Sequence, residues 1–238
     1  ADKSILILGG STSDPFFLGL RSWPDYLQEY INKKGKRICV LNGAVIAYST
    51  TQELLLFQRE GIQKKPDIVI SYTGCNDYAA GMDLPNSRRL PLIGRNLYAN
   101  VEKLISNISE NMPPVYYGEE TEDRFGLFLQ NTRSLSALCR EFGAVYYCCF
   151  QPIISRSIIE PGSISERLLH EETIQESCRR FELFYKQFLE HECSYGWMHD
   201  FSGIFENMSD VFMDAFHTNE KGNQVIAERI YEMIEDII

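Results

Sequence analysis

The 238-residue chain lacks an excess of basic residues. Its 23 lysines and arginines are outnumbered by 33 aspartates and glutamates, which gives a formal net charge of −10. Because phosphate binding needs a basic surface, no nucleic acid is expected as a partner. The chain also lacks an apolar run long enough to cross a bilayer, so no membrane span is expected within it. No signal peptide is visible, and a leader or anchor upstream of Ala1 is compatible with the sequence.

Motifs for metals and phosphates are missing as well. There is no C-x-x-C pair and no Cys/His spacing typical of a zinc site, so we expect no metal and no organic cofactor. Neither G-x-G-x-x-G nor G-x-x-x-x-G-K-[ST] occurs. The seven cysteines form an odd set and mostly lie in apolar segments. This usage indicates buried free thiols and favours a reducing, cytoplasmic compartment.

The chain does contain an alternation of short apolar runs and amphipathic stretches. Continuous apolar runs predict parallel strands at 5–8, 38–41, 68–71, 145–150 and near 197–201. Helical periodicity predicts helices at 97–108, 125–142, 174–188 and 226–237, and 113–118 is predicted to be a loop. This alternation predicts one domain, residues 1–238, with a three-layer α/β/α sandwich, a mostly parallel five-stranded sheet and a flavodoxin-like strand order.

Polar residues follow the predicted strands at their carboxyl ends, where ligands bind in such a sheet. The first strand leads into Gly-Gly-Ser-Thr-Ser at 9–13, the second into Asn-Gly at 42–43, and the third into Gly-Cys-Asn-Asp at 74–77. Asp214 stands three residues before His217, ahead of the last predicted helix. We therefore expect these segments to meet at one edge of the sheet.

The turn at 9–13 has three interpretations from its residues alone. It can be an ordinary tight turn, an anion site made of backbone N–H groups at a helix start, or a turn that presents a nucleophilic side chain. No lysine stands in the turn, which weakens the anion interpretation. Within 74–77, Cys75 is a lesser candidate nucleophile, and Asp77 is expected to be a structural hydrogen-bonding residue.

The nucleophile interpretation is favoured because the other segments supply its partners. His217 can take the proton of Ser11, and Asp214 can hold the imidazole in the required orientation. Candidate donors to the developing oxyanion are the backbone N–H groups of Ser11 and Gly43 and the side-chain amide of Asn76. An acid only three residues before its histidine argues against the α/β-hydrolase arrangement.

In this order, the segments resemble the blocks of the SGNH, or GDSL-like, hydrolase superfamily. The four namesake residues would be Ser11, Gly43, Asn76 and His217. The third block (74–77) and the last block (214–217) are intact, whereas the first has Gly10 where the family usually has Asp, and the second is loose. The resemblance spans nearly the whole chain. It implies a serine ester hydrolase that forms an acyl-enzyme and needs no cofactor.

The substrate is less constrained by the sequence. Candidate substrate-binding residues are Trp23, Tyr78, Arg88, Arg89, Arg95 and the Gln-Pro turn at 151–152. The arginines lie on the loop 82–96, which can equally be a solvated loop. The resemblance implies acetylated carbohydrates, other short acyl esters or lysolipids. No long apolar groove can be read from the sequence, so short acyl groups on a glycan or small molecule are favoured.

Two alternatives stay open at this point. The same residues would serve an O-acyltransferase that uses a sugar hydroxyl in place of water. From a different class, a catalytically silent flavodoxin-like binding domain would have the same fold. The sequence indicates no particular oligomeric state.

Overall fold

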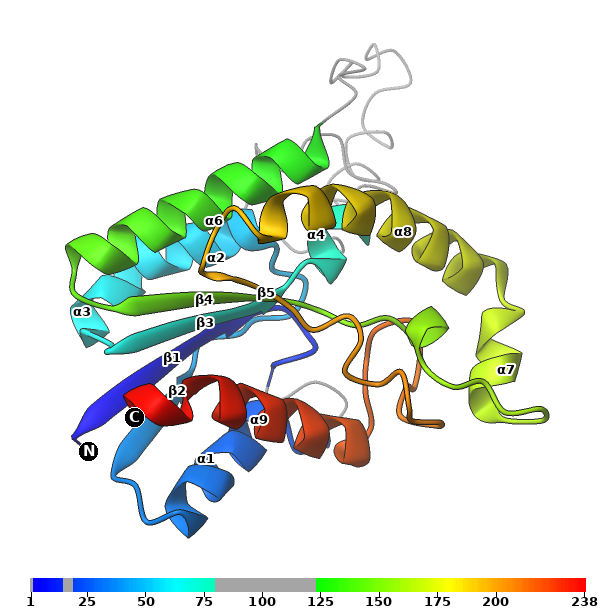
Figure 1. Ribbon diagram of the computed structural model, residues 1–238, viewed down its shortest axis with the longest axis horizontal. Coiled ribbons are helices and arrows are strands. Elements are labelled where there is room, and N and C mark those ends of the chain that lie inside the picture. The colour runs from blue at the N-terminus through cyan, green and yellow to red at the C-terminus, as the bar shows by residue number, and fades with distance from the viewer. Residues whose placement is uncertain (1, 15–18, 80–122) are drawn as a thin grey trace, which may run out of the picture.

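The computed structural model describes residues 2–14, 19–79 and 123–238. Three predictions lie outside these residues: the helix at 97–108, the loop at 113–118 and the loop at 82–96 with its three arginines. The described chain folds around a five-stranded sheet in the order β2-β1-β3-β4-β5 (Figure 1). All four neighbouring pairs are parallel. The predicted parallel sheet and its strand order are therefore confirmed.

The five strands lie where continuous apolar runs predicted them. They are β1 (Lys3–Gly9), β2 (Ile38–Asn42), β3 (Ile68–Thr73), β4 (Val145–Phe150) and β5 (Met198–Asp200). Every residue of β3 is buried, as are the last five residues of β1, so neither strand alternates between a buried and an exposed face. This pattern is expected of a parallel sheet that helices cover on both sides.

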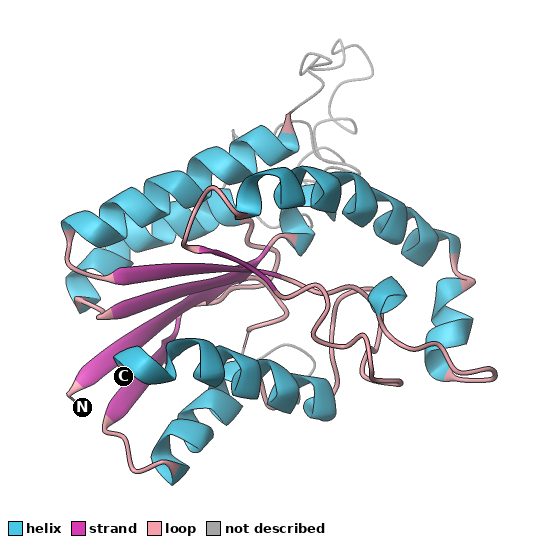
Figure 2. Ribbon diagram, viewed as in Figure 1, coloured by secondary structure: helices cyan, strands magenta, loops and turns pink. Residues whose placement is uncertain are grey.

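Helices cover the two faces of the sheet in separate layers (Figure 2). One layer contains α1 (Trp23–Lys33) and α9 (Glu220–Ile234), and the other contains α2 (Thr50–Leu56), α6 (Arg124–Glu141) and α8 (Glu172–Glu192). The shorter elements are η2 (Phe57–Gly61), α3 (Ile62–Lys64), α4 (Cys75–Ala79), η3 (Ile154–Arg156), α7 (Ile164–Leu169) and η4 (Glu235–Ile237). The three-layer sandwich is confirmed.

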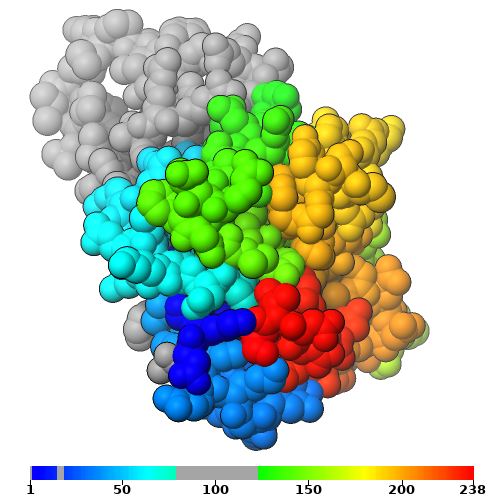
Figure 3. All heavy atoms as spheres, turned by 60° about the vertical axis from the view of Figure 1, so that its left-hand side comes forward, coloured from blue at the N-terminus to red at the C-terminus, as the bar shows by residue number. Residues whose placement is uncertain are grey.

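The three predicted helices within the described residues are present. The α6 helix ends before Gly143, whose φ of 79° is the left-handed conformation that glycine adopts most readily after a helix. The two ends of the described chain lie together, since Lys3 Nζ at the start of β1 donates to the carbonyl of Ile237. The space-filling view places the first strand beside the last helix (Figure 3). Buried apolar side chains of the described residues form one continuous cluster around the sheet.

Candidate active site

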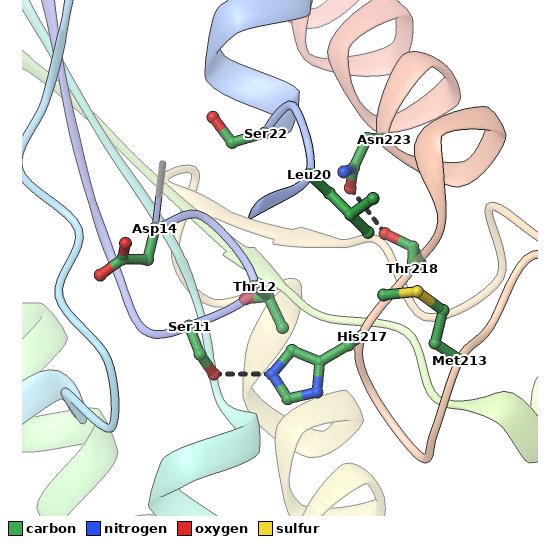
Figure 4. Close-up of a pocket in the computed structure, with 9 residues that line it drawn as sticks. All are labelled: Ser11, Thr12, Asp14, Leu20, Ser22, Met213, His217, Thr218 and Asn223. Atoms are coloured by element: carbon green, nitrogen blue, oxygen red, sulfur yellow. Dashed lines mark hydrogen bonds between the residues drawn. The ribbon is translucent and has the colours of Figure 1, made fainter. Parts of the chain in front are cut away.

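A serine, a histidine and an aspartate form a hydrogen-bonded chain at the carboxyl edge of the sheet. Ser11 Oγ lies 2.8 Å from His217 Nε2 (Figure 4), and His217 Nδ1 lies 2.6 Å from Asp214 Oδ2. An ionised carboxylate only accepts hydrogen bonds, so the Nδ1 proton faces Asp214 and Nε2 is left to accept the Ser11 hydroxyl. The structure thus brings together the three residues that the sequence singled out.

A tight loop presents His217 to the serine. Asp214 Oδ1 accepts the backbone N–H groups of Phe216 and His217, each at 2.8 Å, as an aspartate does in a turn that it stabilises itself. The Met213 N–H then donates to the His217 carbonyl at 2.8 Å and closes the loop. Asn219 caps α9 directly afterwards, because its side chain accepts from the Gly222 N–H at 3.1 Å. The spacing Asp-x-x-His therefore follows from one turn.

The carboxyl group of Asp214 is held in its charged form. Burial acts to raise its pKa, but the hydrogen bond and charge of the His217 side chain, together with the two backbone donors, outweigh burial. The pKa of Asp214 therefore lies below its ordinary value. A carboxylate that stays ionised near neutral pH can stabilise an imidazolium when His217 takes a proton.

Asn76 lies close to the turn that carries Ser11. Its side-chain Nδ2 donates to the carbonyl of Tyr48 at 2.8 Å, which fixes the orientation of the amide. A primary amide has two N–H donors, so one bond to Tyr48 does not exhaust Asn76. Gly74, two residues earlier, has a φ of 115° that favours glycine and allows the sharp turn after β3.

The backbone N–H of Gly43 is not free to serve as the oxyanion donor that the sequence predicted. Its N–H donates to the carbonyl of Ile7 at 2.9 Å and extends the ladder between β1 and β2, so the prediction that Gly43 supplies an oxyanion donor is wrong. The loop that follows turns back to the site, where the Val45 N–H donates to the Gly9 carbonyl at 3.1 Å. Further along this loop, Ala47 has a φ of 64°, a conformation that non-glycine residues seldom adopt.

Ala47 is the residue that the sequence reasoning missed. Its neighbour Tyr48 accepts from Asn76 through its carbonyl, and Val45 donates to Gly9, so the Ala47 N–H lies on a segment that contacts both the Asn76 turn and the Ser11 turn. Among the described residues, no hydrogen bond leaves that N–H. A backbone donor has no side-chain signature, and an alanine gives no sequence signal of a left-handed conformation.

Two predicted substrate contacts are buried core residues. Trp23 is 0% exposed, and its Nε1 donates to Ser13 Oγ at 2.9 Å. Tyr78 is 3% exposed and packs its ring against Phe181 and Phe184. The prediction that they contact substrate is therefore wrong. The other three predicted contacts, Arg88, Arg89 and Arg95, lie outside the described residues.

The remaining candidates in 74–77 are structural. Burial raises the pKa of the Cys75 thiol well above its usual range, so this cysteine is a poor nucleophile. Asp77 Oδ1 accepts from the Thr50 hydroxyl at 2.5 Å and from the Thr50 N–H at 3.2 Å, which ties α4 to α2. All seven cysteines are free thiols, and four of them are buried.

A small cavity lies beside Ser11 and His217. It measures about 20 Å³, and Ser11, Thr12, Leu20, Met213 and His217 are among its lining residues (Figure 4). This volume is enough for about one water molecule or a group of similar size. Within residues 2–14, 19–79 and 123–238, no three His, Cys, Asp or Glu side chains come together in a way that could hold a metal ion. In the same ranges, no helix is both long and apolar enough to span a bilayer.

A hydroxyl, an imidazole and a carboxylate bonded in series define the serine hydrolase arrangement, which here sits on a parallel α/β/α sandwich. The sequence model described as "GDSL-like Lipase/Acylhydrolase" matches residues 5–230, and the chain belongs to that family. The resemblance found in the sequence blocks is confirmed.

Individual relatives are more distant. An arylesterase of Vibrio mimicus is 26% identical over 136 residues, which are 52% of this chain and 62% of the relative. Among solved structures, an acetylxylan esterase from Geobacillus stearothermophilus is 15% identical with a TM-score of 0.57, over 98% of this chain and 94% of that one. A psychrotrophic esterase from Pseudoalteromonas sp. is 16% identical with a TM-score of 0.56, over 99% and 98%. At these identities the solved structures establish a shared fold.

Proposed function

We propose that the protein is a carboxylic ester hydrolase that works through an acyl-enzyme on Ser11. The observation that carries this proposal is the bonded series from Ser11 Oγ to His217 and from His217 to Asp214, at 2.8 and 2.6 Å. A silent binding domain would have no need to orient an imidazole between a hydroxyl and a carboxylate. Membership of an acylhydrolase family supports the same conclusion.

The reaction has two halves. Ser11 Oγ attacks the ester carbonyl while its proton passes to His217 Nε2, and Asp214 stabilises the resulting imidazolium. The tetrahedral intermediate collapses, the ester C–O bond breaks, and His217 returns the proton to the leaving alcohol. Water then attacks the acyl-enzyme with His217 again as base, releasing the acid and restoring the Ser11 hydroxyl.

The oxyanion needs donors on the side of the carbonyl away from His217. We assign this role to the Ser11 N–H and the Asn76 amide, with the Ala47 N–H taking the place predicted for Gly43. Support comes from the contacts of the Ala47 loop with Gly9 and Asn76. Donors held on backbone and on a bonded amide need little reorganisation when charge develops, which is why such groups lower the barrier.

The favoured substrate is a short acyl ester, in particular an acetyl ester of a carbohydrate or small molecule. The cavity beside Ser11 and His217 measures about 20 Å³, which suits a small acyl group such as acetyl. Structural relatives include an acetylxylan esterase. A second candidate is an aryl ester, because Val45 and Ile46, 38% and 51% exposed, place apolar surface on the loop next to the site. The curated relative is an arylesterase.

Turnover of two substrates tests the activity and separates these candidates. Purified protein should hydrolyse an activated aryl acetate, and Ser11→Ala should abolish this turnover while its melting temperature stays near that of the wild type. Comparing kcat/KM for aryl acetates and acetylated xylo-oligosaccharides then ranks the two substrate classes. Product transferred to added sugar with suppressed hydrolysis would instead identify an O-acyltransferase. Full activity of Ser11→Ala would refute the nucleophile assignment.

A further inference from the structure

Gln151 joins the two turns that carry the catalytic groups. It follows β4 directly and is 2% exposed. Its side-chain Nε2 donates to the hydroxyl of Thr12, and its Oε1 accepts from the backbone N–H of Cys75 at 3.3 Å. Thr12 is the neighbour of Ser11, and Cys75 is the neighbour of Asn76. One planar amide therefore spans from the nucleophile turn to the oxyanion turn.

The backbone of Gln151 is fixed independently of these contacts. Its N–H donates to the carbonyl of Thr73 at 3.1 Å, which continues the pairing of β3 with β4 beyond the last paired residue. The side chain therefore starts from a backbone position that the sheet holds in place. Because the carboxamide is planar, its two contacts define a fixed separation between their partners.

The separation of these two turns matters for the chemistry. Ser11 Oγ must reach the carbonyl carbon while Asn76 reaches the carbonyl oxygen, so the two turns have to keep their spacing to a fraction of an ångström. Other side chains contact one turn each, as Trp23 does with Ser13 on the first, while the 45–48 loop reaches the two turns through separate backbone groups. Gln151 contacts both turns through one side chain.

We propose that Gln151 is a positioning residue, which sets the distance between the Ser11 nucleophile and the Asn76 oxyanion donor through its bonds to Thr12 and Cys75. This inference rests on the proposed function, because it presupposes that Ser11 and Asn76 act on the same ester. Gln151 itself is 2% exposed, so it acts on the reacting groups through Thr12 and Cys75. This burial corrects the prediction that the Gln-Pro turn at 151–152 places Gln151 in the lining of the substrate pocket.

The test compares Gln151→Met with a matched control, Gln28→Met. Both changes remove a bridging amide and keep a side chain of similar length. Gln28 joins α1 to β2, since it donates to the Ile38 carbonyl at 3.0 Å and accepts from the Val40 N–H at 2.8 Å. Ile38 pairs with Lys3 at the amino ends of β2 and β1, whereas Ser11 follows the carboxyl end of β1, and Gln28 itself bonds to neither the Ser11 turn nor the Asn76 turn.

We expect Gln151→Met to lower kcat for an aryl acetate at least about 10-fold with little change in KM, since a displacement of about 1 Å can cost on the order of 100-fold. Gln28→Met should lower the melting temperature and leave kcat of the folded protein unchanged. Thr12→Val, which removes the same contact from the other side, should also lower kcat. The double variant Gln151→Met/Thr12→Val should be no worse than Gln151→Met alone, because Gln151→Met already removes the bond that Thr12→Val breaks.

Normal kcat in folded Gln151→Met, or additive losses in the double variant, would overturn the proposal. If Gln151→Met does not fold, Thr12→Val decides alone, and a normal kcat there overturns it. Ser11→Ala is measured in parallel to separate the two claims. An active Ser11→Ala protein would refute the proposed function itself, whereas an inactive Ser11→Ala beside a fully active Gln151→Met would refute only the positioning role.

Discussion

The side-chain nitrogen of Asn76 lies 2.3 Å from the point that a β-carbon on Gly10 would occupy. The carbonyl of Tyr48 lies 3.1 Å from the same point. Any side chain at position 10 would therefore displace the amide or the turn that carries Ser11. In this chain the residue before the nucleophile therefore leaves room for the Asn76 amide.

Gly10→Ala should therefore impair catalysis more than folding. The added methyl pushes Asn76 away from Ser11, so we expect kcat for an aryl acetate to fall at least about 10-fold. Gly196→Ala is the matched control, because its added β-carbon would meet nothing within 4 Å. That variant should keep wild-type kcat and melting temperature. A Gly10→Ala protein with normal kcat would show that catalysis does not depend on the present position of the Asn76 amide.

Asn76→Ala should lower kcat about 100- to 1,000-fold, the usual cost of losing one oxyanion donor. The change also removes the bond to Tyr48, so the melting temperature should fall by a few degrees, in line with about 1 kcal/mol for one hydrogen bond. Asn76→Asp should be at least as damaging, since a carboxylate would face the oxyanion. If Asn76 only ties its loop together, stability will fall and kcat of the folded fraction will stay near normal.

Asp214→Asn should lose less activity than His217→Ala. The asparagine keeps an oxygen for the Phe216 and His217 backbone donors but loses the charge that stabilises the imidazolium. We expect kcat to fall on the order of 10,000-fold, as is typical when the acid of such a triad is neutralised, and further for His217→Ala. Steady-state kinetics of the two folded variants provide the comparison. Equal losses would mean that the carboxylate contributes more than orientation and charge.

The stability of the protein should depend on Glu53 and on pH. Glu53 on α2 is 0% exposed beside Thr73 and Ser71, and neither carboxyl oxygen has a hydrogen bond of normal geometry among the described residues. Burial raises its pKa to about 7 from an ordinary value of 4.5. Between these values the unfolded chain releases the proton and the folded chain keeps it, so the free energy of unfolding falls as pH rises from 4.5 to about 7.

Glu53→Gln removes this titration. The variant should gain stability relative to the wild type at pH 8 and less or none at pH 4.5, as measured by urea unfolding at both values. Glu60→Gln, at an exposed position, is the control and should show no such pH-dependent gain. A Glu53→Gln protein whose stability difference from wild type is the same at both pH values would contradict the buried, protonated state of Glu53.

The elements that place the site were predictable because their signals are local. Continuous apolar runs fixed the strands, and the three-residue spacing of Asp214 and His217 anticipated a turn in which one carboxylate binds the histidine. Ser11 followed from its place after the first strand. These signals do not depend on knowing which distant residues touch.

The predictions that failed depended on contacts between residues far apart in the chain. The Gly43 N–H is a backbone group, and whether it ends in the sheet ladder or the active site depends on the register between β1 and β2. An aromatic such as Trp23 has the same sequence signal whether it faces substrate or core. The role of Gln151 arises from a contact with Thr12, 139 residues away in the chain, which no periodicity or spacing reveals.

The most direct test of Ser11 as the nucleophile is covalent labelling by a serine-reactive phosphonate, followed by mapping of the modified residue. We expect one adduct per chain, on Ser11, and loss of turnover in proportion to labelling. His217→Ala should label far more slowly, because the base that activates the hydroxyl is gone, and Ser11→Ala should not label. Absence of labelling in the wild-type protein, or an adduct at any other residue, would contradict the account.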